Sequence, residues 1–358
     1  MFKKILVTGV LGQDGANMCE FLLKEPNHKV FGMMRRSANP NFKNTHAFKN
    51  HPNFSLVYGD LTDDVSIDKL VKEINPDYFI NFAANSFVGC SWDMPEHVFD
   101  VNTLGVIRCL ESIRKFNPKC RFYSAGSSEE FGDVDYSPQD IKHPIKPRSP
   151  YGASKAAARH LVKVYGESYG LYAVHGILFN HEGTKRGDEF VTRKISKGVA
   201  RIHHTIKDVE EWRSRRRAKA EFNPIELGNI DSKRDWSDSE DFVTGVWMML
   251  NQDAPKNYIL ASGETHSIRE FIEKAFETAA FNGSYWTGEG VNEQLKHRDG
   301  DHEYTFVQIN PEFYRPAEVA LVLGDSTPIR KELGWSPKSS FDTLVKKMVE
   351  FDLNEARA

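Results

Sequence analysis

A glycine-rich turn near the start of the chain constrains the fold more than any other feature. Residues 4–9 (KILVTG) form a short apolar run typical of a buried strand, and residues 17–24 belong to a helix beyond the turn. Glycine tolerates positive φ values and lets a phosphate approach the backbone, while the helix N-terminus offers N–H groups and partial positive charge. This strand–turn–helix unit predicts a dinucleotide site, built from Gly9, Gly12, Gln13, Asp14 and Gly15.

A glycine turn can also end a strand for structural reasons alone, so the rest of the N-terminal half decides between the two interpretations. Short apolar runs alternate there with helical patterns at 66–74 and 102–116. The further predicted strands are 29–34, 54–59, 78–83, 121–126 and 172–179. Such alternation is typical of right-handed βαβ units, and it predicts an α/β fold with a Rossmann-type, doubly wound parallel sheet.

The pattern loosens after about residue 185 into helices with short strands. We therefore predict a dinucleotide-binding Rossmann domain over 1–185 and a smaller, mixed α/β substrate-binding lobe over 186–358. Part of this lobe can re-enter the N-terminal sheet. The basic segment 207–226 has two interpretations, a solvated helix or loop and a flap over the substrate or against another subunit.

Composition excludes several classes of partner. The net charge of −3 over 358 residues gives no electrostatic case for nucleic acid or an anionic membrane. No run approaches the roughly 20 apolar residues of a membrane-spanning helix, so we expect a cytoplasmic protein. The cysteines are scattered without a CxxC pair, which favours free thiols over disulfides or a metal site: Cys19, Cys90, Cys109 and Cys120.

The end of the second predicted strand indicates which dinucleotide binds. An NAD site usually has an acidic residue there, but this chain has Arg35, Arg36 and Ser37. Two guanidiniums and a hydroxyl suit the 2′-phosphate of NADP, although a pair of solvated arginines is the alternative. Further contacts to the adenine and the nicotinamide-side ribose are expected after the third and fourth strands, at Asp60, Leu61, Phe82, Ala83, Ala84 and Ser86.

Two segments hold candidate catalytic groups. Tyr151 and Lys155 are spaced i, i+4 and share one helical face, where the ammonium favours the phenolate and makes the tyrosine a general base. Ser127 and Glu129 follow the fifth strand, at the carboxyl edge where ligands of such sheets bind. Each pattern alone can arise as a surface pair or a surface turn, and their place after a dinucleotide fold favours catalysis.

Nearly the whole chain resembles the GDP-mannose 4,6-dehydratase family of extended short-chain dehydrogenases/reductases. The matching segments include ILVTGVLGQDG, FYSAGSSEEFG, SPYGASKAAA, LFNHEGTKRGDEFVTRKI, LGNIDSKRDWS and FYRPAEVALVLGD. The resemblance implies an NADP-dependent lyase that forms GDP-4-keto-6-deoxymannose and water from GDP-mannose, in deoxysugar biosynthesis of the GDP-fucose type. It also implies a homodimer or homotetramer.

Residue roles follow from the same resemblance. Tyr151 is the base, Lys155 its partner and a cofactor ligand, Ser127 stands at the family's active-site threonine and Glu129 at its acid/base glutamate. Further implied cofactor contacts are His97, His181 and Arg186. The implied substrate contacts are Ser86, Ser127, Glu129, Asn180, Arg193, Lys194, Gly228, Asn229, Arg234, Arg315 and Glu318.

The chain departs from the family pattern at several positions. Ser127 replaces threonine and loses the methyl group that restricts its rotamers, and Gly126 replaces a serine, which we expect to loosen the same turn. His97 stands where the family usually has a tyrosine, and the 207–226 segment is longer than its counterpart.

Two alternative functions remain open at this point. Another nucleotide-sugar dehydratase, an epimerase or a reductase would use the same fold and Tyr–Lys pair. A non-catalytic nucleotide-binding module would keep the fold, although it would not need a base, its activator and an acid together.

Overall fold

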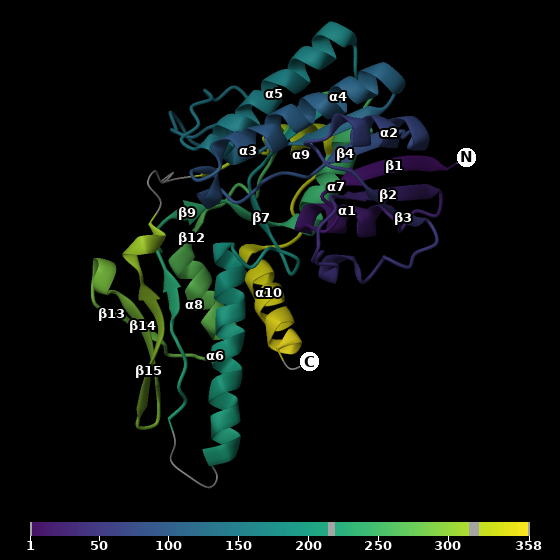
Figure 1. Cartoon of the computed structure of the whole chain (residues 1–358). Coiled ribbons are helices and arrows are strands. Elements are labelled where there is room, and N and C mark those ends of the chain that lie inside the picture. The colour runs from purple at the N-terminus through teal and green to yellow at the C-terminus, as the bar shows by residue number, and fades with distance from the viewer. Residues whose placement is uncertain (1, 214–218, 315–321, 357–358) are drawn as a thin grey trace. The chain divides into compact units, whose positions relative to one another are not determined.

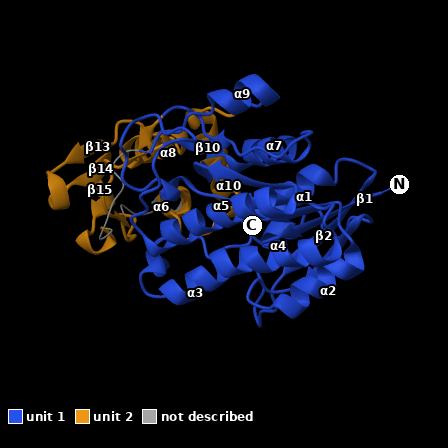
Figure 2. Cartoon of the chain, turned by 90° about the horizontal axis from the view of Figure 1, so that it is seen from above, with its two compact units in different colours: residues 1–181, 235–264, 322–338 blue, residues 182–234, 265–321, 339–358 orange. Residues whose placement is uncertain are grey.

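The computed structural model of the chain describes residues 2–213, 219–314 and 322–356. Contacts divide the chain into two compact units (Figure 2). The first unit comprises Met1–His181, Asp235–Glu264 and Val322–Lys338, and the second comprises Glu182–Arg234, Thr265–Leu321 and Ser339–Ala358. Each unit is thus built from three segments, whereas the sequence suggested one break near residue 185. Which unit binds cofactor and which binds substrate stays a prediction.

A seven-stranded parallel sheet forms the centre of the first unit and confirms the predicted Rossmann-type fold. Its order is β11-β6-β5-β4-β1-β2-β3, so the order reverses beside β1, as in doubly wound sheets. The strands are β1 Lys3–Thr8, β2 His28–Met34, β3 Phe54–Tyr58, β4 Tyr78–Asn81, β5 Arg121–Ala125, β6 Ala173–Leu178 and β11 Ile259–Leu260. Because β11 pairs with β6, part of the C-terminal half does return to this sheet.

Helices cover both faces of the sheet because successive strand residues point to opposite faces. Ile5 and Val7 pack in one core cluster with residues of α1 and α7, and Leu6 packs in the other with residues of α2, α4 and α5 (Figure 1). The helices of this unit are α1 Gln13–Leu22, α2 Asp64–Ile74, α3 Pro95–Phe99, α4 Gly105–Phe116, α5 Pro150–Tyr169, α7 Ser239–Leu250 and α9 Thr327–Leu333. A π-helical turn, η3 Asp100–Leu104, joins α3 to α4. The remaining short elements are η1 Lys43–Thr45, η2 Gly89–Ser91, η4 Ser128–Glu130 and β10 Trp236–Asp238; β7 Asn180–Glu182 spans the boundary after His181.

The second unit is mixed α/β, as predicted. Helices α6 Val191–Arg213, α8 Ile268–Thr278 and α10 Phe341–Glu355 lie side by side (Figure 1). A four-stranded sheet has the order β13-β14-β15-β8, and β9 pairs with β12. These strands are β8 Ile225–Leu227, β9 Lys233–Arg234, β12 His266–Ser267, β13 Tyr285–Thr287, β14 Gln294–Asp299 and β15 His302–Ile309, with η5 Gly290–Asn292 and η6 Pro311–Phe313. Stacked aromatic rings, such as Phe276 on Phe306 at 4.6 Å, fill its core.

The basic 207–226 segment belongs to this second unit. Its first part continues α6 to Arg213, and residues 214–218 lie outside the described part of the chain. Beyond them, Phe222 stacks on Tyr304 with ring centroids 5.6 Å apart, and Ala220 is buried. The end of the segment is therefore packed into the unit. No helix among the described residues is long and apolar enough to cross a membrane.

Candidate functional site

The glycine turn has the close packing that a dinucleotide site requires. Gly9 has φ +68°, and a Cβ there would lie 2.9 Å from the Ala83 nitrogen. A Cβ at Gly15 would collide with the Gly9 carbonyl oxygen. Within the described residues no side chain caps α1 at Gly12, so the helix N-terminus keeps N–H groups to offer phosphates. The turn therefore fits a pyrophosphate.

Gln13, Asp14 and His181, three expected cofactor contacts, bind one another in the structure. The Gln13 side-chain amide donates to the His181 carbonyl at 3.0 Å, and the Asp14 carboxylate lies 3.0 Å from His181 Nε2. His181 Nδ1 lies 2.7 Å from the Phe179 carbonyl, so both ring nitrogens face acceptor oxygens. These contacts join the first turn of α1 to the chain just after β6. Direct contact of the three with cofactor stays a prediction.

The loop after β4 lies beside the glycine turn and is held by buried polar groups that sequence reasoning missed. The hydroxyl of Thr8 donates to Asn81 and accepts from the Ala83 N–H at 2.9 Å. Asn102, in the π-helical turn, accepts from the Asn85 N–H at 2.8 Å and donates to the Ser154 hydroxyl. Expected contacts Phe82, Ala83, Ala84 and Ser86 all lie on this loop. The π-helical turn is the one feature that sets Asn102 apart, and this change in helix type cannot be recognised from the sequence.

The residues expected to select NADP lie directly after β2. Arg35, Arg36 and Ser37 are exposed, and neither arginine has an ion-pair partner among the described residues. Asp60 accepts from the Thr62 N–H and hydroxyl, and Leu61 is buried. His97 is exposed on α3.

The turn after β5 is a capping box. The Ser127 hydroxyl accepts from the Glu129 N–H at 3.2 Å, while the Glu130 carboxylate accepts from the Ser127 N–H at 2.8 Å. Because the Ser127 oxygen is used as an acceptor, its own O–H can donate to a ligand. Glu129 is only partly buried, unlike Glu130.

Tyr151 and Lys155 lie next to this turn on the first turns of α5. Ser149 caps the helix and Pro150 occupies its first position. A Cβ at Gly152 would lie 2.5 Å from the Glu129 carbonyl oxygen, so the helix packs directly on the turn after β5. Lys155 Nζ donates to the Ala125 carbonyl at 2.8 Å and lies 5.8 Å from the centre of the Tyr151 ring. The predicted quartet of Ser127, Glu129, Tyr151 and Lys155 is thus assembled at one edge of one sheet.

Burial governs the electrostatics of Lys155. Desolvation lowers the pKa of Lys155 to about 8, although the carboxylates of Glu130 and Asp14 act in the opposite direction. Lys155 and Tyr151 are both buried. An ammonium with a lowered pKa beside a phenol is suited to proton transfer near neutral pH.

Most candidate substrate contacts lie in the second unit, and those that the structure describes there already have partners. Arg193 is buried and bonds Asp352 at 2.6 Å, and Lys194 Nζ lies 3.9 Å from the centre of the Phe313 ring. Arg186, which the resemblance implies as a cofactor contact, lies over the Phe190 ring, and that role stays a prediction. Arg234 is buried and donates to the Lys233 carbonyl, Gly228 lies against the Phe313 backbone, and Asn229 accepts from the Asp231 N–H. Asn180 belongs to β7, while Arg315 and Glu318 lie outside the described residues. Their roles toward substrate stay predictions.

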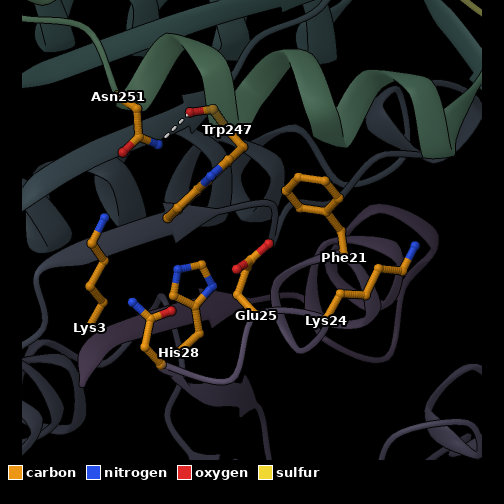
Figure 3. Close-up of a pocket in the computed structure, with 8 residues that line it drawn as sticks. Lys3, Phe21, Lys24, Glu25, His28, Trp247 and Asn251 are labelled. Carbon is orange, nitrogen blue, oxygen red and sulfur yellow. Dashed lines mark hydrogen bonds between the residues drawn. The ribbon is translucent and has the colours of Figure 1, made fainter. Parts of the chain in front are cut away.

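A pocket of about 320 Å³ lies at the opposite edge of the sheet (Figure 3). Lys3 and His28 at the starts of β1 and β2 line it, together with Trp247 and Asn251 at the end of α7. Asn251 donates to the Trp247 carbonyl, and His28 bonds the Leu22 carbonyl. Because the strands are parallel, this pocket lies at their amino ends, away from Tyr151.

Fold and site together define a Rossmann-type protein of the short-chain dehydrogenase/reductase kind, and comparisons narrow this class. Structures of two enzymes match equally well, each with a TM-score of 0.79. One is a dTDP-glucose 4,6-dehydratase from Streptomyces venezuelae with NAD bound, 20% identical and covering 99% of this chain and 98% of its own. The other is a UDP-glucose 4-epimerase from Thermotoga maritima, 18% identical and covering 99% and 100%. At such identities the likeness concerns the fold alone.

Sequence comparison is more specific. The sequence model of the family described as GDP-mannose 4,6 dehydratase matches residues 6–348. A GDP-mannose 4,6 dehydratase of Drosophila melanogaster is 40% identical over 364 aligned positions, which cover 99% of this chain and 87% of the relative. The chain therefore belongs to the GDP-mannose 4,6-dehydratase family.

Proposed function

We propose that this protein is a nucleotide-sugar 4,6-dehydratase, which converts GDP-mannose into GDP-4-keto-6-deoxymannose and water with NADP as bound cofactor. Family membership over residues 6–348 carries the proposal. The fold alone does not, since it is equally similar to a dehydratase and an epimerase. The assembled quartet at the sheet edge argues against a non-catalytic binding module.

The glycine turn fits the pyrophosphate, and the residues after β2 and β4 would hold the two ends of the dinucleotide. NADP, when bound, supplies a hydride acceptor for C4 of the sugar and a hydride donor for C6. The choice of NADP over NAD rests on Arg35 and Arg36, two exposed guanidiniums without ion-pair partners among the described residues.

The chain's own residues move the protons. Tyr151, as phenolate beside the Lys155 ammonium, accepts the proton of the sugar 4-hydroxyl. A ketone at C4 then acidifies the C5–H, and Glu129 accepts that proton. The same carboxyl group donates it to the departing 6-hydroxyl, so one water leaves and Glu129 regains its charge. The Ser127 hydroxyl orients the sugar by donating a hydrogen bond.

The first test is the mass of the product. Purified protein incubated with GDP-mannose and NADP should yield a product lighter by one water, detected by mass spectrometry. An epimerase product would keep the mass of the substrate, a reductase would act only in a parallel incubation with NADPH and consume it, and a binding module would leave the sugar unchanged. Each of these three results would overturn the dehydratase assignment.

Isotopes give a second test. GDP-mannose with deuterium at C4 should give product with deuterium in the C6 methyl group, and solvent deuterium should enter at C5. Loss of the C4 label to solvent would contradict internal hydride transfer.

We further infer a cytoplasmic homodimer or homotetramer. The family resemblance supports the assembly, and four free cysteines suit a reducing compartment. Light scattering of the purified protein would reveal a monomer if the assembly is wrong. The basic 207–226 segment keeps its two interpretations. Deletion of its excess residues should raise the Michaelis constant or change the measured mass if the segment is a flap or a subunit contact, and if neither changes the solvated interpretation holds.

A further inference from the structure

Glu130 is a buried carboxylate of the catalytic turn that the proposed mechanism does not use. Its side chain is wholly buried, and Oε1 accepts from the Ser127 N–H at 2.8 Å. The same oxygen lies 2.8 Å from Nε2 of His175, which is equally buried on β6. His175 Nδ1 lies 3.3 Å from the Ser124 hydroxyl. Since an unpaired buried charge is costly, this carboxylate depends on the partners that surround it.

Gly126 makes room for the pair. A Cβ at this position would overlap His175 Nε2 and would lie 2.7 Å from Glu130 Oε1 and 2.8 Å from the Gly176 carbonyl oxygen. The sequence led us to expect that Gly126 loosens the turn. In the structure the missing side chain instead admits the two groups that bind the turn to β6.

Glu130 also acts on Lys155. Burial tends to raise the pKa of Glu130, but His175, the Ser127 N–H and Arg159 together lower it, so the group is a carboxylate. Arg159 Nη1 lies 3.8 Å from its second oxygen. The Lys155 ammonium donates to Ala125, one residue before Gly126. The charges that act on Lys155 are Glu130 on the turn and Asp14 on α1, and the Tyr151 ring lies beside it on α5.

We propose that Glu130 and His175 form a buried positioning pair, which fixes the turn that carries Ser127 and Glu129 and supplies negative charge to hold Lys155 as an ammonium. The pair contacts no reacting atom in the proposed mechanism and acts through its neighbours. The proposal rests on the proposed function for its kinetic consequences, but its structural part is independent of substrate.

Glu130→Gln separates charge from shape. The glutamine oxygen can still accept from the Ser127 N–H and from His175, while the negative charge is lost. The alkaline limb of the kcat/KM profile should then move to lower pH by about one unit, which makes the variant about tenfold slower than the native protein at high pH. Asp135→Asn is the matched control, because this exposed carboxylate pairs with Lys146 and is not among the charges acting on Lys155. An unmoved alkaline limb in the Glu130→Gln variant would overturn the charge role.

His175 tests the positioning role. His175→Leu cannot donate to Glu130, so it should lower kcat with little change in KM, and His175→Gln should restore much of the rate. Equal kcat in the leucine and glutamine variants would contradict positioning.

An unfolding cycle with Glu130→Gln, His175→Gln and the double variant needs no substrate and tests the pair independently of the kinetics. The pair predicts that the double variant loses less stability than the two single losses added, and strict additivity would refute the pair. If the native protein yields no dehydrated product, the proposed function fails, while this cycle still decides on the pair.

Discussion

Among the described residues, a buried carboxylate is paired with a buried nitrogen-bearing side chain in each unit of the protein, and the two pairs hold different parts of the fold together. Glu130 and His175 lie 2.8 Å apart, and the carboxylate also accepts from the Ser127 N–H in the turn after β5. Arg193 and Asp352 lie 2.6 Å apart and join α6 to α10, with the Ser196 hydroxyl as a further donor to the carboxylate. Among the described residues, each pair leaves one buried atom without a hydrogen bond, Oε2 of Glu130 and Nε of Arg193.

A buried charge costs free energy because it has lost its hydration, and burial alone does not show that the residue binds a ligand. Breaking either pair leaves a charge in a low-dielectric interior. Only the Glu130–His175 pair bonds the backbone of a residue in the proposed mechanism, at the Ser127 N–H. Changes to this pair should therefore alter the dehydration rate, whereas changes to the Arg193–Asp352 pair should alter the free energy of unfolding.

The largest expected effect is on rate. Tyr151→Phe keeps the buried ring and removes only the proton acceptor, so the dehydration rate should fall by about 10²–10⁴-fold. The free energy of unfolding should change little. Tyr136→Phe, which removes an exposed hydroxyl bonded to Asp140, is the control and should keep the native rate. A Tyr151→Phe variant with near-native rate would exclude this tyrosine as the base.

Disruption of the second pair should give the largest loss of stability. Arg193→Met leaves the Asp352 carboxylate buried without its cation, so the free energy of unfolding should drop by about 3–5 kcal/mol in chemical denaturation. Adding Asp352→Leu should recover most of the loss.

The exposed pair of Lys346 and Glu350 on α10 provides the control for this stability test. Lys346→Met should cost about 0–1 kcal/mol. If Arg193→Met instead keeps full stability and raises the Michaelis constant for GDP-mannose, Arg193 is a substrate ligand, as the family resemblance implied.

Cofactor choice should change by a smaller factor. Replacing Arg35 and Arg36 with Ala removes charge-assisted contacts worth roughly 1.5–3 kcal/mol, so NADP should bind at least about tenfold more weakly while NAD binding changes little. Titration calorimetry with both cofactors would measure this. Lys29→Ala, an exposed change at the other end of β2, should alter neither affinity. Equal weakening of NADP and NAD would refute the 2′-phosphate assignment.

The sequence was sufficient to predict the parallel sheet and the placement of Ser127, Glu129, Tyr151 and Lys155 at one edge of it, because both depend on local patterns. The catalytic role of these residues stays a prediction. Alternating apolar runs specify the strands, and the i, i+4 spacing places Tyr151 and Lys155 on one helical face. The carboxyl edge of the sheet then brings Ser127 and Glu129 to them.

Long-range partners were beyond such reasoning. His175 is a lone polar residue in an apolar strand, a visible signal, but nothing local links it to Glu130, which is 45 positions away. For the same reason Gly126 was interpreted as a loosening change, since the side chains that would collide with a Cβ come partly from β6. For Arg193 the sequence pointed the other way. The family resemblance implied a substrate contact, and the structure shows an internal partner, Asp352 on α10.

The smallest expected effect is a dependence of stability and rate on pH, and it comes from Lys155. Burial lowers the pKa of Lys155 to about 8 in the folded protein, against an ordinary value of 10.5. Between these values the unfolded chain binds more protons than the folded one, so the free energy of unfolding increases as pH rises.

The dehydration rate should fall over the same pH range, because Tyr151 loses the neighbouring ammonium. Denaturation of native protein and of Lys155→Met between about pH 7.5 and 9.5 isolates the increment, which the methionine variant should lack. Identical pH slopes in the two proteins would show that Lys155 titrates at its ordinary pKa, and a rate that holds steady above pH 8 would separate the ammonium from the chemistry.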